Sequence, residues 1–182
     1  MTDIISLAQK IYILLEVINM KTALIRSKIN DEIYTPEEAI LPLLNYLPKN
    51  ITIWECTDFG ESNITKVLKN NGYKVISSHK ADIDFLTDVP EFDFDMIITN
   101  PPYSIKDAFI EKCYSYKKPF ALLLPITALE GVKRGELYRK YGIELLVLDR
   151  RINFLSNKKS NWFNTSWFCF NVLPKQLIFE GI

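Results

Sequence analysis

The sequence predicts a single α/β domain built on a mostly parallel β-sheet that helices cover on both faces. Short apolar stretches rich in β-branched and aromatic residues alternate with stretches of helical periodicity along most of the 182 residues. The stretch 120–124 is the most apolar of these, as expected for a buried strand. A hydrophobic content of 48% is enough to form a core without metals or disulfides.

The N-terminal residues predict a helical extension that precedes this domain. Residues 3–29 carry apolar side chains at helical spacing, which indicates a helix or helix pair packed on the domain or, alternatively, a partner-binding or dimerisation helix. The apolar run 11–15 is far too short to span a bilayer, so we expect a cytoplasmic protein without membrane contact. We therefore divide the chain into an extension, 1–30, and a domain, 31–182.

The elements of the domain follow from local patterns in chain order. Thr35 predicts an N-cap and Pro36 a first helical position, with the helix continuing to about Tyr46. A second helix, 64–70, is expected to end at Asn71-Gly72, because glycine commonly closes helices. The remaining expected helices are 107–116 and 135–141, and the expected strands are 51–55, 73–78, 94–99, 120–124, 143–148, 167–172 and 176–179.

The charge and the rare residues exclude several classes of function. Twenty-two basic and 22 acidic side chains cancel, so a nucleic-acid-binding protein of this composition needs a local basic patch. The three cysteines are widely spaced and lack a C-x-x-C pairing, which argues against a disulfide framework or a zinc site and for a reducing compartment. With His79 as the sole histidine, a His-based metal centre or catalytic triad is not expected, and we predict no metal.

The sequence Asn100-Pro101-Pro102-Tyr103 directly follows a predicted strand, where open α/β sheets bind their ligands. Each proline fixes its own φ and restrains the preceding residue to extended geometry, so Asn100 and Pro101 are held rigidly. The amide oxygen of Asn100 and the carbonyl oxygen of Pro101 can then converge on one external NH₂ group. Tyr103 adds a flat face, and this combination suits an exocyclic amine on a planar base. A rigid turn without a ligand is the alternative.

This motif resembles the signature of the amino-methyltransferases that act on adenine N6, cytosine N4 or a glutamine amide. The resemblance covers most of residues 34–173 and is nearest to small phage-borne adenine-methylase-like proteins. It implies a Rossmann-like class I methyltransferase fold and S-adenosylmethionine as the cofactor. The catalytic residues that it implies are Asn100, Pro101, Pro102 and Tyr103.

The resemblance also implies where the cofactor binds. Its methionine end would lie near residues 34–36 and the loop 55–63, and its adenine near residues 82–85. This loop has a single glycine, where the family has two or more, and His79 follows the second strand where an acid normally binds the ribose hydroxyls. The expected cofactor-binding residues are Tyr34, Thr35, Pro36, Glu55, Asp58, Gly60, His79, Asp82, Asp84 and Phe85.

DNA is the expected substrate, and local positive charge is the expected means of binding it. Basic pairs cluster in the C-terminal half, in or near predicted loops, and contact with phosphates there would weaken steeply with salt. An aromatic residue would hold the extruded base. The expected nucleic-acid-binding residues are Lys133, Arg134, Arg150, Arg151, Lys158, Lys159 and Trp167.

Two hypotheses of different kinds follow. The first is S-adenosylmethionine-dependent methyl transfer to the N6 amino group of adenine in DNA. The second is a catalytically inactive methyltransferase-like phage protein that binds nucleic acid or a host defence nuclease, as anti-restriction or anti-CRISPR inhibitors do. The glycine-poor loop and the missing ribose acid favour the second, and the intact Asn-Pro-Pro-Tyr favours the first. Methylation of a protein glutamine is a third, weaker alternative.

Overall fold

The computed structural model describes residues 35–58, 60–154 and 164–182, and the statements below concern these residues. They form one seven-stranded sheet in the order β2-β1-β3-β4-β6-β5-β7. Strand β6 is antiparallel to both neighbours, and the other six strands run parallel to one another. The strands are β1 (Thr52–Glu55), β2 (Lys74–Ser77), β3 (Met96–Thr99), β4 (Phe120–Pro125), β5 (Glu144–Leu148), β6 (Thr165–Phe170) and β7 (Leu177–Glu180).

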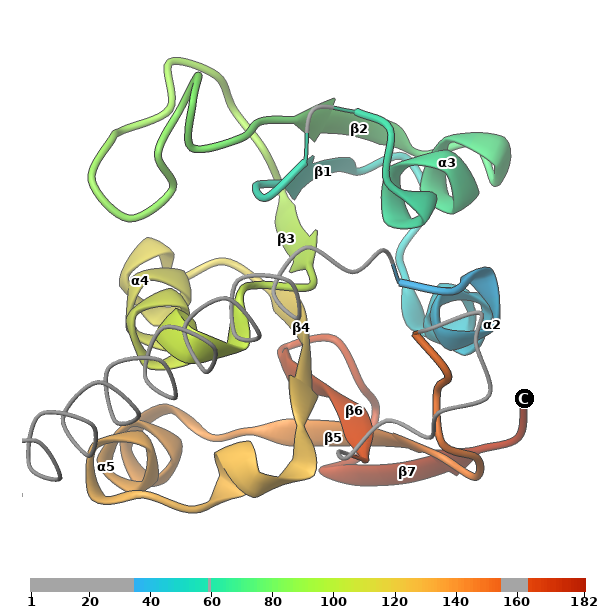
Figure 1. Cartoon of the computed structure of the whole chain (residues 1–182), viewed down its shortest axis with the longest axis vertical. Coiled ribbons are helices and arrows are strands. Elements are labelled where there is room, and N and C mark those ends of the chain that lie inside the picture. The colour runs from blue at the N-terminus through green and yellow to red at the C-terminus, as the bar shows by residue number, and fades with distance from the viewer. Residues whose placement is uncertain (1–34, 59, 155–163) are drawn as a thin grey trace, which may run out of the picture. The chain divides into compact units, whose positions relative to one another are not determined.

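Helices cover both faces of this sheet, which confirms the predicted fold class. Helices α2 and α3 lie on one face, and α4 and α5 lie on the other (Figure 1). Short 3₁₀ helices follow α2 and the carboxyl ends of β3 and β4. The helices are α2 (Glu37–Ile40), η1 (Leu41–Tyr46), α3 (Asn63–Asn70), η2 (Tyr103–Ile105), α4 (Lys106–Tyr116), η3 (Ile126–Leu129) and α5 (Val132–Tyr141).

The core has two layers because side chains alternate along each strand. In β4, Ala121 and Leu123 face α2 and α3, whereas Phe120, Leu122 and Leu124 face α4 and α5, and all five are fully buried. Such continuous burial is typical of a central strand in a parallel sheet covered on both faces. Strand β4 is therefore packed by apolar side chains on both of its faces.

The start of the first described helix differs from the prediction. Pro36 is the N-cap residue, the helix begins at Glu37, and the hydroxyl of Thr35 makes no capping hydrogen bond. The α-helix ends after Ile40 and continues as the 3₁₀ helix η1, which contains Pro42. A proline ring removes an N–H and clashes with the carbonyl four residues earlier, so the α-helix stops here. The Thr35 hydroxyl is thus available for another contact.

The chain order reverses between two central strands. From β1 the chain passes to β2 at the edge, then returns to β3 on the other side of β1. Ligands of open α/β sheets bind beyond the carboxyl ends of the strands at such a reversal. These ends are Glu55 and Thr99, so the fold places any site where Asn100 emerges.

Neither a membrane-spanning helix nor a metal-binding cluster occurs within these described ranges. No helix among them is long and apolar enough to cross a membrane. No three or more histidine, cysteine or acidic side chains among them are grouped so that they could hold a metal ion.

Candidate functional site at the carboxyl ends of strands β1 and β3

A buried carboxyl group joins the carboxyl ends of the two central strands. Glu55 ends β1 and is 1% exposed, and its Oε1 accepts hydrogen bonds from the hydroxyls of Thr99 (2.6 Å) and Thr57 (2.9 Å). The backbone N–H of Thr57 donates to the same oxygen at 3.1 Å, and the Ser62 hydroxyl donates to Oε2 at 3.2 Å. The two threonine hydroxyls lie 2.6 Å apart. This network fixes the residue that precedes Asn100.

The environment of Glu55 favours its protonated form. Burial raises the pKa of Glu55 from 4.5 to about 7, and it is the largest influence. The hydrogen bond from Thr99 lowers the pKa, the negative charge of Asp58 raises it further, and the hydrogen bonds from Thr57 lower it. No lysine or arginine in the described part of the chain forms an ion pair with Glu55 or Asp58. The carboxyl end of β1 therefore holds two acidic side chains that no described lysine or arginine pairs with.

Asp58 organises the loop between β1 and α3. Its carboxylate accepts hydrogen bonds from the N–H groups of Gly60 (2.9 Å), Glu61 (3.2 Å) and Ser62 (2.9 Å), and from the Thr65 hydroxyl (3.1 Å). Burial, the largest single influence, raises the pKa of Asp58, but these hydrogen bonds outweigh it, so the pKa lies below its usual value. Gly60 adopts a φ of +99°, which an L side chain rarely tolerates. The loop thus closes around Asp58 with a single glycine.

Replacing Asp58 by alanine should destabilise this loop and the fold. The variant leaves three N–H groups and a buried hydroxyl without their acceptor, and an unsatisfied buried donor costs about 1–3 kcal/mol. We expect the free energy of unfolding in urea at pH 7 to fall by about 2 kcal/mol. Asp93→Ala, at an exposed position, is the control and should change stability by less than about 0.5 kcal/mol. Equal urea unfolding curves for Asp58→Ala and Asp93→Ala would contradict this role of Asp58.

Asn100 lies directly after β3 and contacts the residue that precedes Pro36. Its side-chain Nδ2 donates to the Thr35 hydroxyl at 3.0 Å. Its Oδ1 is buried and has no hydrogen-bond partner among the described residues. A buried acceptor without a partner is unfavourable, and native proteins keep few of them. This oxygen is therefore the atom of the site at which we expect a hydrogen-bond donor from a ligand.

The rest of the proline turn is partly used in packing. Pro101 is buried, and the carbonyl oxygen of Pro102 accepts from the N–H of Ile105 at 3.1 Å. Tyr103 begins η2, is half-buried, and packs against the core cluster on the face of α4 and α5. The turn is therefore rigid, as its two prolines predict.

The residues expected near the cofactor adenine and ribose lie in the loop after β2. His79 is half-buried and its Nδ1 accepts from the N–H of Ala81 at 3.3 Å, whereas Asp82 is exposed. Asp84 is half-buried and its carboxylate accepts from the N–H of Leu86 at 2.9 Å. The Phe85 ring is 2% exposed and stacks on Phe109 with centroids 4.9 Å apart, so it belongs to the core. Of the remaining expected cofactor residues, Tyr34 lies outside the described residues.

The expected DNA-binding residues separate into exposed and internal groups. Lys133, Arg150 and Arg151 are exposed and follow the carboxyl ends of β4 and β5, at the same edge as Asn100. Arg134 instead pairs with Asp107 and donates to the carbonyl oxygens of Ala128 (2.8 Å) and Glu130, so it ties α5 to α4 and η3. Lys158 and Lys159 lie outside the described residues.

The expectation that Trp167 contacts a base is wrong. Its side chain is 0% exposed in the core beneath α2, and its indole N–H donates to the carbonyl oxygen of Ala39 at 2.7 Å. An aromatic residue in a strand covered on both faces contributes to packing, and the buried N–H needs an internal acceptor. The sequence pattern alone did not distinguish this role from base stacking.

A polar network that local sequence patterns did not indicate positions Asn100. The side chains of this network connect Glu55, Asp58 and Thr35, and none of them was an expected site residue; they are Thr57, Thr99, Ser62 and Asn63. Hydroxyl side chains at both strand ends were the available signal, because a buried carboxyl group needs nearby donors.

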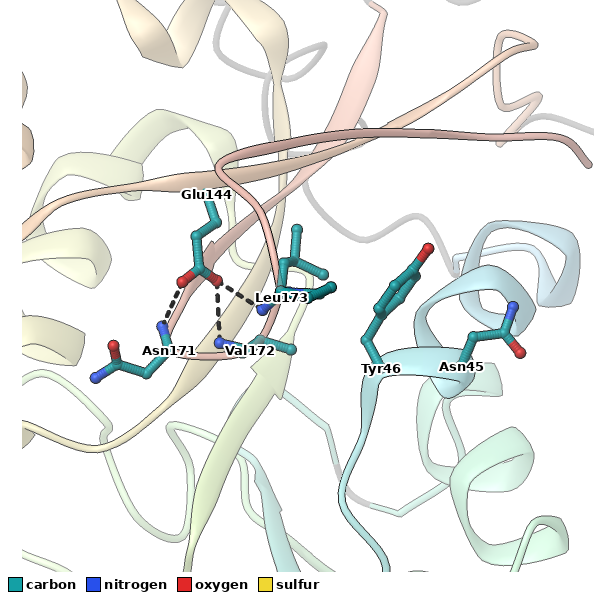
Figure 2. A pocket seen from close by; sticks show the side chains of 7 residues that line it. Asn45, Tyr46, Glu144, Asn171, Val172 and Leu173 are labelled. Atoms are coloured by element: carbon teal, nitrogen blue, oxygen red, sulfur yellow. Dashed lines mark hydrogen bonds between the residues drawn. The ribbon is translucent and has the colours of Figure 1, made fainter.

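A pocket of about 610 Å³ lies at the opposite edge of the sheet (Figure 2). It is next to the first residue of β5, Glu144, whose carboxylate accepts from the N–H groups of Asn171 (3.1 Å), Val172 (3.0 Å) and Leu173 (2.8 Å). Glu144 thereby holds the turn between β6 and β7. The residues that line the pocket are Asn45, Tyr46, Glu144, Asn171, Val172, Leu173 and Pro174, and none is an expected site residue.

Comparison with known proteins identifies the fold. No protein-family model and no curated protein matches the sequence. A Listeria monocytogenes structure assigned to the class I S-adenosylmethionine-dependent methyltransferases superposes with a TM-score of 0.50 at 11% identity, over 82% of this chain and 65% of that one. This chain has the Rossmann-like class I methyltransferase fold and spans about two thirds of that structure's length.

Two further structures match with lower scores. A TehB-like S-adenosylmethionine-dependent methyltransferase of Corynebacterium glutamicum has a TM-score of 0.42 at 16% identity, over 85% of this chain and 97% of that one. A modification subunit assigned to a type I restriction enzyme of Vibrio vulnificus has a TM-score of 0.47 at 10% identity, over 96% of this chain and 52% of that one.

Proposed function

We propose that the chain transfers a methyl group from S-adenosylmethionine to the N6 amino group of adenine in DNA. The observation that carries this proposal is the buried Oδ1 of Asn100 at the carboxyl end of β3, which no described residue contacts with a hydrogen bond. An acceptor in this position matches an amino group, which donates, and does not match a carbonyl group. Because the oxygen is buried, an incoming amine reaches it only after the groups packed over it move.

Asn100 and Pro101 would act on the amine rather than on the methyl donor. The Asn100 side-chain oxygen and the Pro101 carbonyl oxygen would each accept a hydrogen bond from the N6 amino group. These two hydrogen bonds would localise the nitrogen lone pair and orient it. The amine would then face the electrophilic methyl group that S-adenosylmethionine would supply, and one N6 proton would pass to solvent. Such positioning and fixed dipoles supply most of the acceleration in reactions of this type.

The anionic loop after β1 fits a cationic cofactor. S-adenosylmethionine supplies an electrophilic methyl group on a positively charged sulfonium. Glu55 and Asp58 form a buried acidic pair without an ion pair to a described lysine or arginine, so a nearby positive charge would be attracted. Asp58, Gly60 and the half-buried Asp84 are the residues that we propose to hold it.

DNA would bind across the same edge of the sheet. Lys133, Arg150 and Arg151 are exposed there, and their charges would contact phosphates. An adenine in duplex DNA must leave the helical stack before its amino group can reach Asn100. The affinity of the protein for DNA should therefore fall steeply as the salt concentration rises, whereas the affinity for an uncharged ligand would change less.

A paired binding and transfer experiment tests this function. Calorimetric titration with S-adenosylmethionine should show saturable binding, and tritiated cofactor should label DNA that contains adenine. The control is DNA of the same sequence in which purine, which lacks the amino group, replaces each adenine; it should stay unlabelled. Labelling of both DNAs, or labelling only at cytosine, would contradict the assignment to adenine N6.

A second candidate is a methyltransferase-like protein that binds nucleic acid or a nuclease without catalysis. The observation in its favour is that both acidic residues of the loop are already engaged: Glu55 by Thr57, Thr99 and Ser62, and Asp58 by backbone N–H groups. The absence of heat at millimolar S-adenosylmethionine, together with intact DNA binding, would support this candidate over the enzyme.

A further inference from the structure

Thr35 is the residue that contacts both halves of the candidate site. Its side-chain oxygen accepts from Asn100 Nδ2 at 3.0 Å, and its carbonyl oxygen accepts from Asn63 Nδ2 at 2.9 Å. Asn63 is the first residue of α3, immediately after the loop that Asp58 organises. Thr35 itself is 3% exposed and does not cap α2. Its hydroxyl is therefore committed to Asn100.

In the observed contact, the oxygen of Asn100, and not its nitrogen, is left for a ligand. A primary amide has a donor nitrogen and an acceptor oxygen, and rotation about its terminal torsion is broad. With Nδ2 held by Thr35, Oδ1 is the atom left without a partner among the described residues. An amide that turned the other way would present an NH₂ group to an incoming amine, and two donors cannot pair.

We propose that Thr35 is a positioning residue for the amine substrate, holding Asn100 so that its oxygen accepts from the amino group of the base. This inference rests on the proposed function. It also departs from the role that the family resemblance implies for Thr35, which is contact with the methionine end of the cofactor. The two roles predict different kinetic effects, because one concerns the target base and the other concerns cofactor affinity.

The test is Thr35→Val, which keeps the shape and the backbone carbonyl but removes the hydroxyl. We expect kcat for tritium transfer to adenine-containing DNA to fall about 10²-fold, as for a misplaced reacting group, while the Kd for S-adenosylmethionine changes less than about twofold. Thr35→Ser should restore most of kcat. Ser115→Ala, which removes an exposed hydroxyl near the end of α4, is the matched control and should leave kcat unchanged.

A double variant separates this role from a structural one. If Thr35 acts through Asn100, Thr35→Val should have no further effect on kcat once Asn100 is alanine. An equal loss in both backgrounds, or a loss of cofactor affinity with kcat unchanged, would overturn the proposal.

A measurement without catalysis distinguishes failure of the inference from failure of the proposed function. The Asn100 side-chain NH₂ resonances, assigned in ¹⁵N-labelled full-length protein by comparison with Asn100→Ala, should exchange with solvent at least about tenfold more slowly in the wild type than in Thr35→Val. Equal exchange rates would overturn the positioning role even if the protein is an enzyme. If exchange is slow in the wild type and fast in Thr35→Val, but the wild type transfers no methyl group, the contact between Thr35 and Asn100 is supported and the proposed activity is rejected.

Discussion

Replacing Asn100 by alanine is expected to lower kcat for methyl transfer to adenine-containing DNA by about 10²–10³-fold, the usual cost of removing one preorganised polar group. The variant removes the acceptor that would bind the amino group, but it does not touch the loop around Asp58. The Kd for S-adenosylmethionine should therefore change less than about twofold. Single-turnover labelling with tritiated cofactor measures the first quantity, and calorimetry measures the second.

Two comparisons make this expectation specific. Asn70→Ala, at an exposed position near the end of α3, is the matched control and should retain full transfer. The free energy of unfolding of Asn100→Ala should stay within about 1 kcal/mol of the wild type. One hydrogen bond is lost, but a buried oxygen without a partner among the described residues is removed as well. Full transfer activity in Asn100→Ala would reject the role assigned to the proline turn.

The stability of the protein is expected to fall as the pH rises from about 4.5 to about 7 because of Glu55. In the unfolded chain this carboxyl group ionises near pH 4.5, whereas in the folded chain burial raises its pKa to about 7. The folded state thus holds the extra proton across this interval, and each rise in pH favours unfolding. The difference amounts to about 3 kcal/mol and is complete above pH 7.

Glu55→Gln isolates this effect from all other titrating groups. The glutamine oxygen can still accept from Thr57 and Thr99, and its NH₂ group can donate to the Ser62 hydroxyl, so the network survives without a charge. Urea unfolding at pH 5 and pH 8 should show the variant gaining about 2.5 kcal/mol relative to the wild type between the two values. Asp58 contributes in the opposite direction and at lower pH, because its lowered pKa stabilises the fold until the pH falls below about 4.

Glu111→Gln, at an exposed position of α4, is the matched control and should follow the wild-type curve. If the wild type and Glu55→Gln had the same dependence on pH, Glu55 would have the same pKa in the folded and unfolded chains and would be ionised in both between about pH 5 and pH 8. The hydroxyl network would then have to be interpreted as a site that stabilises an anion.

Burial of the Glu55 carboxyl group lowers the stability of the fold near neutral pH, which indicates a functional reason for an acidic residue at this position. A neutral residue at the end of β1 would pack without any dependence on pH, yet the chain places a carboxyl group there with three hydroxyl donors. Buried groups with shifted pKa values cluster at functional sites. A cationic ligand at this edge would favour the ionised form, so cofactor binding should lower the pKa of Glu55 and release a proton above about pH 5.

Local sequence was a good guide to the strands and a poorer guide to the side chains at their ends. Apolar runs predicted the strands because burial on both faces requires them, as in 120–124. The two prolines predicted a rigid turn at Asn100, since their effect on the backbone is local. Thr35 was misjudged as a cap, and Trp167 as a base contact, because their partners, Asn100 and Ala39, lie 65 and 128 residues away.

The sequence by itself determined the α/β class, the alternation of strands and helices, and the constrained Asn100 turn, because periodicity and proline geometry act over a few residues. Only the tertiary structure decided that β1 and β3 are neighbours at the reversal of chain order, with Glu55 hydrogen-bonded to Thr99 and Thr35 to Asn100. These contacts depend on strand order and on which polar groups are buried together. Such long-range pairing has no signature in the spacing of residues along one chain.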